Sequence, residues 1–292
     1  LKYIQSSSHD GEPIHSVHTD LIYSDLKFSN IDFEDIDVLF ICMGHGNSAK
    51  FLAENPVPAT VKIIDLSNDF RLKADAGEFV YGAPELNREQ IKGCRCVANP
   101  GCFATAIQIG LLPLAAAGLL KNEIHTNGIT GSTGAGVKPG ATSHFSWRNN
   151  NISIYKAFTH QHLIEIGMTI RNLQPSFDKD INFLPVRGDF SRGIYVSQYT
   201  ECDLDEEAAI KLYKDFYKDS AFTFVMDKNP DLKQVVNTNK GIVHVEKHGN
   251  KLLIISMIDN LLKGASGQAV QNFNLMFGLD EKMGLNLKSV AF

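Results

Sequence analysis

The sequence predicts an α/β fold in which a parallel sheet covered by helices is followed by a second, α+β domain. Near-continuous apolar runs at 38–43 and 61–66, separated by a short helical segment, are typical of parallel strands buried on both faces. After residue 119 the pattern changes, and the alternation of Tyr195, Ser197 and Tyr199 indicates a sheet with one solvated face. A chain of 292 residues is long enough for two domains.

The predicted elements follow from apolar runs, helical spacing and the Gly and Pro residues that interrupt them. The first domain is expected to contain strands 1–5, 38–43, 61–66 and 96–98 and a helix at 47–54. A helix over 103–119 leads into strands 124–130, 181–184, 193–199, 241–245 and 252–256 and helices 161–173 and 205–217. A last helix, 266–277, is expected to return to the first domain.

Composition argues against several classes of partner. Hydrophobic residues make up 43% of the chain and charged residues 21%, and the net charge of −5 gives no electrostatic support for nucleic-acid binding. No apolar run is long enough to span a bilayer, and we expect no membrane partner. The five cysteines lack disulfide or zinc spacing, which favours a reducing compartment, the cytoplasm.

Cys102 is the strongest candidate for a catalytic nucleophile. Pro100 and Gly101 interrupt the backbone just before it, and the apolar run that follows has helical length. A thiol in the first turn of a helix faces unpaired N–H groups and the positive end of the dipole, so we expect a lowered pKa and a reactive thiolate. The alternative is a buried cysteine that acts as a small hydrophobe.

A pair of histidines is the second candidate for catalysis. Thr159 can cap a helix whose first turn carries His160 and His162. His162 and Glu165 are three residues apart and share a face, so the carboxylate is expected to orient the imidazole. Zinc would require histidines four apart, which argues against a metal site. A surface histidine pair is the alternative, and a thiol protease would leave the two glycine-rich segments without a purpose.

Those two glycine-rich segments favour anions or planar rings. Gly131–Gly136 exposes backbone N–H groups, and Asn260 opens a second glycine-rich entry to a helix. Ser6 and Ser8 end the predicted first strand with no acidic residue before Asp10, a pattern that favours NADP over NAD.

Arginines mark the candidate substrate region. The polar stretch 142–151 contains the only tryptophan and Arg148, which indicates a recognition loop. Arg187 and Arg192 lie in a loop that contains Gly188 and Gly193, and guanidinium groups suit carboxylate or phosphate recognition. A solvated charged loop is the alternative.

Several segments together resemble the N-acetyl-gamma-glutamyl-phosphate reductase family. They are ANPGCFATAIQIGLLPL (98–114), GSTGAG (131–136), HQHLIEI (160–166), RGDFSRGI (187–194) and NLLKGASGQAVQNFN (260–274), and SHFSWRNNNIS resembles a shorter bacterial subtype. The family is similar in fold to aspartate-semialdehyde dehydrogenase. The resemblance implies a Rossmann-type NADP-binding domain over 1–101, completed by 263–292. A catalytic and oligomerisation domain over 102–262 would assemble into a homodimer or homotetramer.

The resemblance also implies a mechanism in arginine biosynthesis. Cys102 would attack an acyl phosphate to give a thioester, NADPH would reduce the thioester to the semialdehyde, and His160 or His162 would transfer protons. Glu165 completes the expected catalytic set. The residues expected at the cofactor are Ser6, Ser8, Gly44, His45, Ser132, Gly134, Gly136 and Asn260. Those expected at the substrate are Arg71, Ser132, Arg148, Arg187 and Arg192.

One departure from the family and several alternatives remain at this point. Members of the family begin with a strand and a glycine-rich turn that the sequence lacks, and we expect an N-terminal segment to precede Leu1. The same chemistry on an N-succinyl-glutamyl, aspartyl or aminoadipyl phosphate is an alternative. A non-catalytic relative is another, although Cys102 and the histidine pair argue against it.

Overall fold

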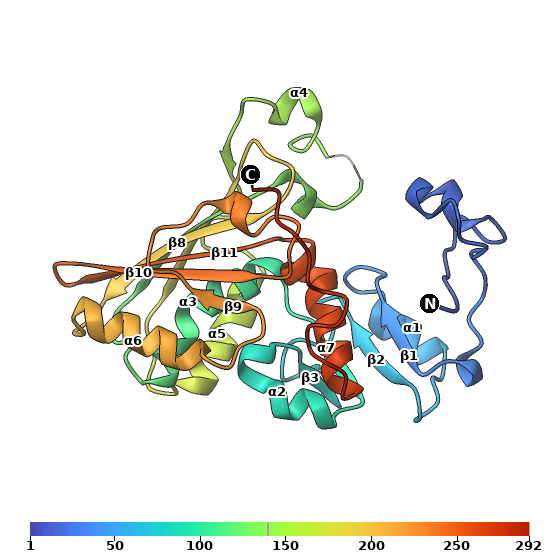
Figure 1. Ribbon diagram of the computed structural model, residues 1–292, viewed down its shortest axis with the longest axis horizontal. Helices are drawn as coiled ribbons and strands as arrows, with labels where there is room; N and C mark the ends of the chain where they lie inside the picture. The colour runs from blue at the N-terminus through green and yellow to red at the C-terminus, as the bar shows by residue number, and fades with distance from the viewer. Residues whose placement is uncertain (139, 292) are drawn as a thin grey trace.

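The first sheet of the protein is short and entirely parallel. In the computed structural model, which describes residues 1–138 and 140–291, its strand order is β1-β2-β4-β3 (Figure 1). The strands are β1 (Val38–Ile41), β2 (Lys62–Asp65), β3 (Phe79–Tyr81) and β4 (Cys96–Ala98), and the helices between them are α1 (Ser48–Glu54) and α2 (Pro84–Gly93). Parallel neighbours need crossover connections, and α1 and α2 supply two of them.

Helix α7 (Gly267–Met276) joins this first sheet although it lies near the end of the sequence. Ala269, Leu275 and Met276 share one hydrophobic cluster with Ile64 of β2 and Val97 of β4. Figure 1 shows the red helix beside α2 and β3. The chain therefore leaves the first domain after β4 and comes back to it after the second sheet.

The predicted strand at residues 1–5 is wrong. Ile4 makes only an isolated parallel bridge to Phe28, and three short 3-10 turns at Ile14–Ser16, Thr19–Leu21 and Phe33–Asp35 follow. A strand needs a partner along its length, and the segment up to residue 35 lies beyond β1 as an irregular chain (Figure 1). The apolar run at residues 1–5 does not show whether a neighbouring strand lies beside it.

The second sheet has seven strands in the order β6-β7-β5-β8-β11-β10-β9. Their bounds are β5 (Ile124–Thr130), β6 (Ser153–Ile154), β7 (Ile181–Arg187), β8 (Ile194–Glu201), β9 (Thr223–Val225), β10 (Gly241–His248) and β11 (Lys251–Ile258). The pairs β5–β7 and β9–β10 are parallel and the others antiparallel. This mixed sheet agrees with the α+β prediction.

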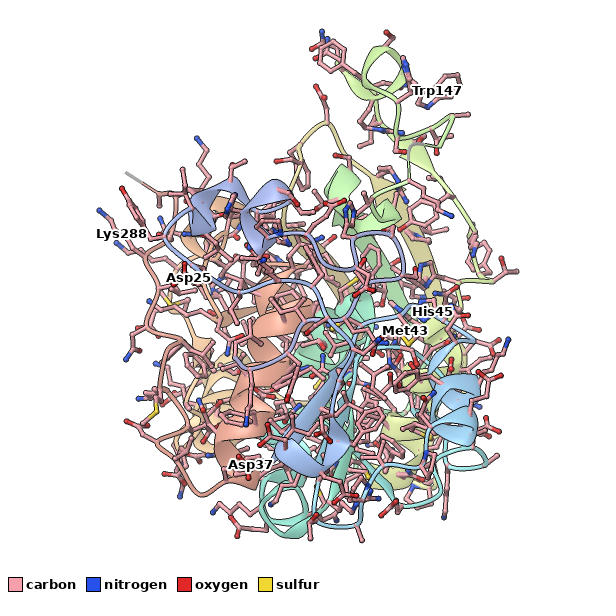
Figure 2. All side chains as sticks on the ribbon, turned by 90° about the vertical axis from the view of Figure 1, so that its right-hand side faces the viewer. Asp25, Asp37, Met43, His45, Trp147 and Lys288 are labelled. Carbon is pink, nitrogen blue, oxygen red and sulfur yellow. The ribbon has the colours of Figure 1, made fainter. Side chains whose placement is uncertain are left out.

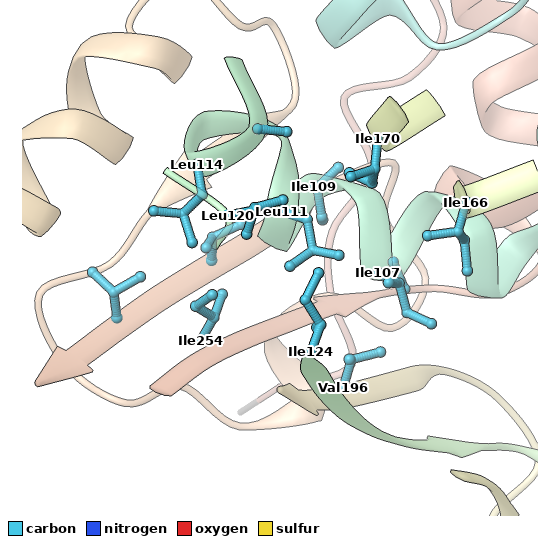
Figure 3. Close-up of a cluster of buried hydrophobic side chains, with 14 of the residues drawn as sticks. Ile107, Ile109, Leu111, Leu114, Leu120, Ile124, Ile166, Ile170, Val196 and Ile254 are labelled. Atoms are coloured by element: carbon cyan, nitrogen blue, oxygen red, sulfur yellow. The ribbon is translucent and has the colours of Figure 1, made fainter. Parts of the chain in front are cut away.

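Three helices cover one face of this sheet: α3 (Cys102–Ala116), α5 (His162–Leu173) and α6 (Glu206–Tyr217). Figure 3 shows the core that results, in which isoleucines and leucines of α3 and α5 pack on Ile124, Val196 and Ile254 of the sheet. The opposite face is less covered, since Tyr199 is 39% exposed and stacks on His125. In the described part of the chain, no helix combines the length and apolarity that crossing a bilayer requires.

Helix α3 is almost completely buried and contains Pro113. Proline has no N–H, so the carbonyl of Ile109, four residues earlier, loses its helical partner. The hydroxyl of Tyr217 in α6 donates to that carbonyl at 2.6 Å, and Tyr213 donates to the carbonyl of Gly110 at 2.6 Å. Two buried tyrosines therefore anchor α3 to α6.

Replacing Tyr217 with Phe tests this anchor. The substitution leaves a buried carbonyl without a partner, and we expect the free energy of unfolding to fall by about 1–3 kcal/mol. The exposed Tyr199→Phe is the matched control and should stay within about 0.5 kcal/mol of the wild type. Chemical denaturation followed by circular dichroism measures both, and equal losses in the two variants would contradict the assignment.

Candidate active site

A cavity of about 470 Å³ lies where the end of β4 meets the second domain. Both domains contribute to its wall, and His45, labelled in Figure 2, marks the part that comes from the first sheet. The structure brings together these residues singled out from the sequence: His45, Arg71, Cys102, Gly134, Gly136, His160, His162, Arg187 and Asn260. The wall also contains Thr133, Tyr155 and Lys156, which the sequence analysis did not single out.

Other candidate residues lie outside the cavity wall. Ser6 and Ser8 pair with each other at 3.3 Å in the N-terminal segment. Gly44 forms the left-handed turn (φ +82°) next to His45, and Ser132 begins the short 3-10 turn Ser132–Ala135 without lining the wall.

Arg148 and Arg192 bind other parts of the protein. The buried Arg148 guanidinium donates to the carbonyls of Thr142, Asn151 and Arg187 and so holds the 142–151 loop against β7. The Nε of Arg192 lies 2.8 Å from Oδ2 of the fully buried Asp259. In this structure both arginines organise loops instead of facing the cavity.

The turn before Cys102 is built by glycine. A Cβ on Gly101 would lie 2.4 Å from Nε2 of His162 and 2.8 Å from Nη1 of Arg71, so only glycine lets these groups approach. A Cβ on Gly264 would lie 2.8 Å from the Cβ of Cys102. Cys102 is the first residue of α3; the His162 ring approaches the preceding Gly101, and Gly264 lies against the Cβ of Cys102.

The expected low pKa of the Cys102 thiol is wrong. Burial raises its pKa above the ordinary value of 9.0, and the Phe103 N–H and the Arg71 charge lower it by less. The helix N-terminus acts in the predicted direction, but desolvation in the domain boundary outweighs it. At neutral pH the resting protein therefore carries a thiol, which must lose its proton when it reacts.

Glu165 does not contact His162 as expected. Its Oε1 accepts from the Gly101 N–H at 2.9 Å and the Tyr81 hydroxyl at 2.7 Å, and Oε2 lies 3.5 Å from Nη1 of Arg71. The buried Nδ1 of His162 has no hydrogen-bond partner within the described residues. Glu165 therefore holds the cysteine turn in place, and the helical spacing that predicted a shared face could not show what that face meets.

The two histidines occupy different surroundings. The ring of His160 packs edge-on against Phe103 and Phe183, and its Nδ1 accepts the backbone N–H of His162 at 3.2 Å. Burial lowers the pKa of both rings to about 3; the next causes are His162 for His160 and Arg71 for His162. Both rings are neutral at physiological pH, and His162 is the one whose Nε2 faces the cysteine turn.

Three cations surround the cavity. Arg71 is buried and satisfied, since it donates to the carbonyls of Asn99 and Leu66 and pairs with Glu165. Arg187 stacks 4.8 Å above the Tyr155 ring, and its buried Nη1 has no partner in the described part of the chain. The third is Lys156, and its place four residues before His160 was the available sequence signal.

A π-helical turn, Leu262–Ser266, leads from the second domain into α7 and lines the cavity with Gly264 and Ala265. Asn260 accepts the Gly193 N–H at 2.7 Å and donates to Thr133 Oγ1 at 3.1 Å, so it joins two loops of the wall. Lys263 forms a buried ion pair with Glu85 of α2 at 2.8 Å. Although burial raises the pKa of that carboxyl, Lys263 holds it below its ordinary value. This pair fastens the turn to α2.

The comparisons with known proteins agree with this two-domain site. Residues 1–94 match a semialdehyde dehydrogenase NAD binding domain, and residues 102–260 match a semialdehyde dehydrogenase dimerisation domain. An N-acetyl-gamma-glutamyl-phosphate reductase of Azobacteroides pseudotrichonymphae is 62% identical over 99% of this chain and 91% of its own length. The chain belongs to the N-acetyl-gamma-glutamyl-phosphate reductase family. A member from Parabacteroides distasonis is 56% identical over 100% of this chain and 91% of its own length.

Solved structures of aspartate-semialdehyde dehydrogenases share the fold of this chain. An aspartate-semialdehyde dehydrogenase from Candida albicans, solved with NADP, has a TM-score of 0.70 at 12% identity and covers 97% of this chain and 92% of its own. Aspartate-semialdehyde dehydrogenase II of Vibrio cholerae has a TM-score of 0.68 at 16% identity and covers 94% and 88%. The Rossmann-type domain with a second α+β domain is therefore confirmed.

The raised pKa of Cys102 gives a direct test. A thiol with a raised pKa is less ionised at neutral pH, so its alkylation by iodoacetamide should keep rising with pH beyond the range in which an ordinary cysteine levels off. Mass spectrometry of the Cys102 peptide, in the folded protein and in the urea-unfolded chain, measures both pH profiles. A folded profile shifted to lower pH would contradict the assignment.

Proposed function

We propose that the protein reduces N-acetyl-L-glutamyl 5-phosphate to N-acetyl-L-glutamate 5-semialdehyde with NADPH and releases inorganic phosphate, as a step of arginine biosynthesis. The observation that carries the proposal is the Cys102 turn, with Nε2 of His162 on one side and cations around the cavity. The names of the relatives at 62% and 56% identity support the same substrate.

In the first step the Cys102 sulfur attacks the acyl carbon. A C–S bond forms, the bond from the acyl carbon to the phosphate oxygen breaks, and inorganic phosphate leaves. His162 takes the thiol proton, and the N–H groups at the start of α3 stabilise the negative charge that develops on the acyl oxygen. The cationic wall offsets the charge of the substrate.

The low pKa of His162 is a property of the resting site. Burial lowers it first, and the charge of Arg71 and the other cations adds to the effect. An anionic substrate in the cavity opposes these positive charges and therefore raises the pKa of the imidazole. The base gains strength when the acyl phosphate is bound, which is when the thiol must be deprotonated.

In the second step the thioester is reduced and the cysteine is released. When bound, NADPH supplies the hydride for this reduction. The protonated His162 then returns its proton to the departing Cys102 sulfur, which restores the thiol and the neutral imidazole. The buried Tyr81–Glu165–Arg71 cluster keeps the turn fixed through both steps.

The glycine-rich turn and the loop after β1 fit a nicotinamide nucleotide. Gly134 and Gly136 line the cavity, and Gly136 has a left-handed backbone (φ +85°) that suits glycine. His45 and Asn260 complete this side of the wall. We propose NADP as the nucleotide, because no acidic residue precedes Asp10 in the N-terminal segment that holds Ser6 and Ser8, although these serines lie outside the cavity wall.

We also infer a homodimer or homotetramer in the cytoplasm. Two observations support assembly through the domain 102–262. It matches a dimerisation domain, and one face of its sheet, which carries the exposed Tyr199, is not covered by helices within the described residues. Five free cysteines support a reducing compartment. The nucleotide domain would comprise 1–101 and 263–292, of which positions 1–101 and 263–291 are described.

The reverse reaction tests the function. N-acetylglutamate semialdehyde, inorganic phosphate and NADP⁺ should give phosphate-dependent NADPH absorbance. Cys102→Ser should abolish the signal, because its hydroxyl is a far weaker nucleophile than a thiolate, while NADP⁺ binding measured by calorimetry is retained. Turnover in Cys102→Ser would rule out the thioester, and a signal with only the N-succinyl substrate would change the acyl group.

Separate histidine variants test the proton transfer. His162→Asn should lower the rate by roughly 10²–10⁴-fold, the usual contribution of a general acid or base. His160→Asn is the matched control and should lose less, since that ring packs among Phe103 and Phe183. Steady-state rates of both variants decide the assignment, and a larger loss in His160→Asn would transfer the role to His160.

A further inference from the structure

Lys156 lies on the cavity wall in a strained turn between β6 and α5. Its backbone is left-handed (φ +46°), and so is that of Phe158 (φ +58°). Non-glycine residues seldom adopt this conformation, and it persists where the surroundings enforce it. Here they do, because the N–H groups of Tyr155 and Phe158 donate to the carbonyls of Pro185 and Phe183 in β7.

The charge of Lys156 is free for a ligand. Arg71 is neutralised by Glu165, whereas Lys156 has neither an ion pair nor a hydrogen bond to its ammonium in residues 1–138 and 140–291. Lys156 lines the same cavity as His160 and His162. The side chain is exposed, so it stands at the open side of the cavity.

Arg187 is the complement of Lys156. It is 8% exposed, its guanidinium is held over the Tyr155 ring, and one buried nitrogen, Nη1, has no partner in the described part of the chain. A fixed, planar guanidinium suits a planar carboxylate, whereas a compact ammonium on a flexible stem suits a tetrahedral phosphate. The cavity thus offers two different cations to a substrate that has two different anionic groups.

We infer that Lys156 binds the phosphate of the acyl phosphate, and that Arg187 binds the carboxylate that stays on the substrate. This inference rests on the proposed function. The phosphate leaves after the first step, and the exposed position of Lys156 lets it depart to solvent. The carboxylate must remain bound while the thioester is reduced, which the buried position of Arg187 provides.

The reverse reaction separates the two subsites. Lys156→Gln should raise KM for inorganic phosphate by roughly tenfold or more, because a charge-assisted contact is lost. KM for the semialdehyde should stay within about twofold, and Lys156→Arg should recover most of the phosphate affinity. Arg187→Gln is the matched control. It should raise KM for the semialdehyde and leave KM for phosphate within about twofold. An unchanged phosphate KM in Lys156→Gln, or an equal rise for both substrates, would overturn the inference.

A binding measurement keeps this test independent of turnover. Inorganic phosphate, at constant ionic strength, should protect Cys102 of the wild-type protein from iodoacetamide, and protection should weaken in Lys156→Gln by a similar factor. Equal protection in both proteins overturns the subsite. Protection that depends on Lys156 without turnover of the wild type supports the subsite and removes the proposed reaction. Turnover of the wild type together with protection that does not depend on Lys156 supports the proposed reaction and overturns the subsite.

Discussion

The architecture of the active site depends on one buried carboxylate, that of Glu165. It joins four segments: α5, which carries it, β3 through Tyr81, the loop after β2 through Arg71, and the cysteine turn through the N–H of Gly101. Without it, a buried arginine would lack its counter-ion, a loss that costs far more than a surface pair contributes. Through these contacts it fastens the two domains around the cavity.

The resting site carries positive charge, but its nucleophile is a protonated thiol and therefore unreactive. Its thiol and its imidazoles are neutral because burial disfavours their charged forms, while three permanent cations line the wall. Such a site attracts anions before it can activate its nucleophile. The charge of the substrate itself supplies the change in environment that moves the proton, so the reactive thiolate forms where the acyl phosphate already lies.

The sequence predicts most of the long elements, but it misses the ten-residue helix α2 and the short strands β3, β6 and β9. Helices α5 and α6 begin within one residue of their predicted starts, because their apolar positions repeat over three turns. Strand β3 has three residues and was missed, since only its pairing with β4 makes it a strand. The same limit applies to Glu165 and Cys102. Local spacing predicts that Cys102 starts a helix and that Glu165 shares a face with His162. The burial of the Cys102 thiol and the hydrogen-bond partners of Glu165 depend on segments that lie far away in the sequence.

The position of Cys102 at one end of α3 has a mechanical consequence. The helix is about 22 Å long at 1.5 Å per residue, and its middle is anchored to α6 by the two tyrosine hydroxyls. A rigid rod fixed in this way carries small displacements from its anchor to its tip. The outer helix α6 is therefore linked through α3 to the nucleophile, although it does not line the cavity.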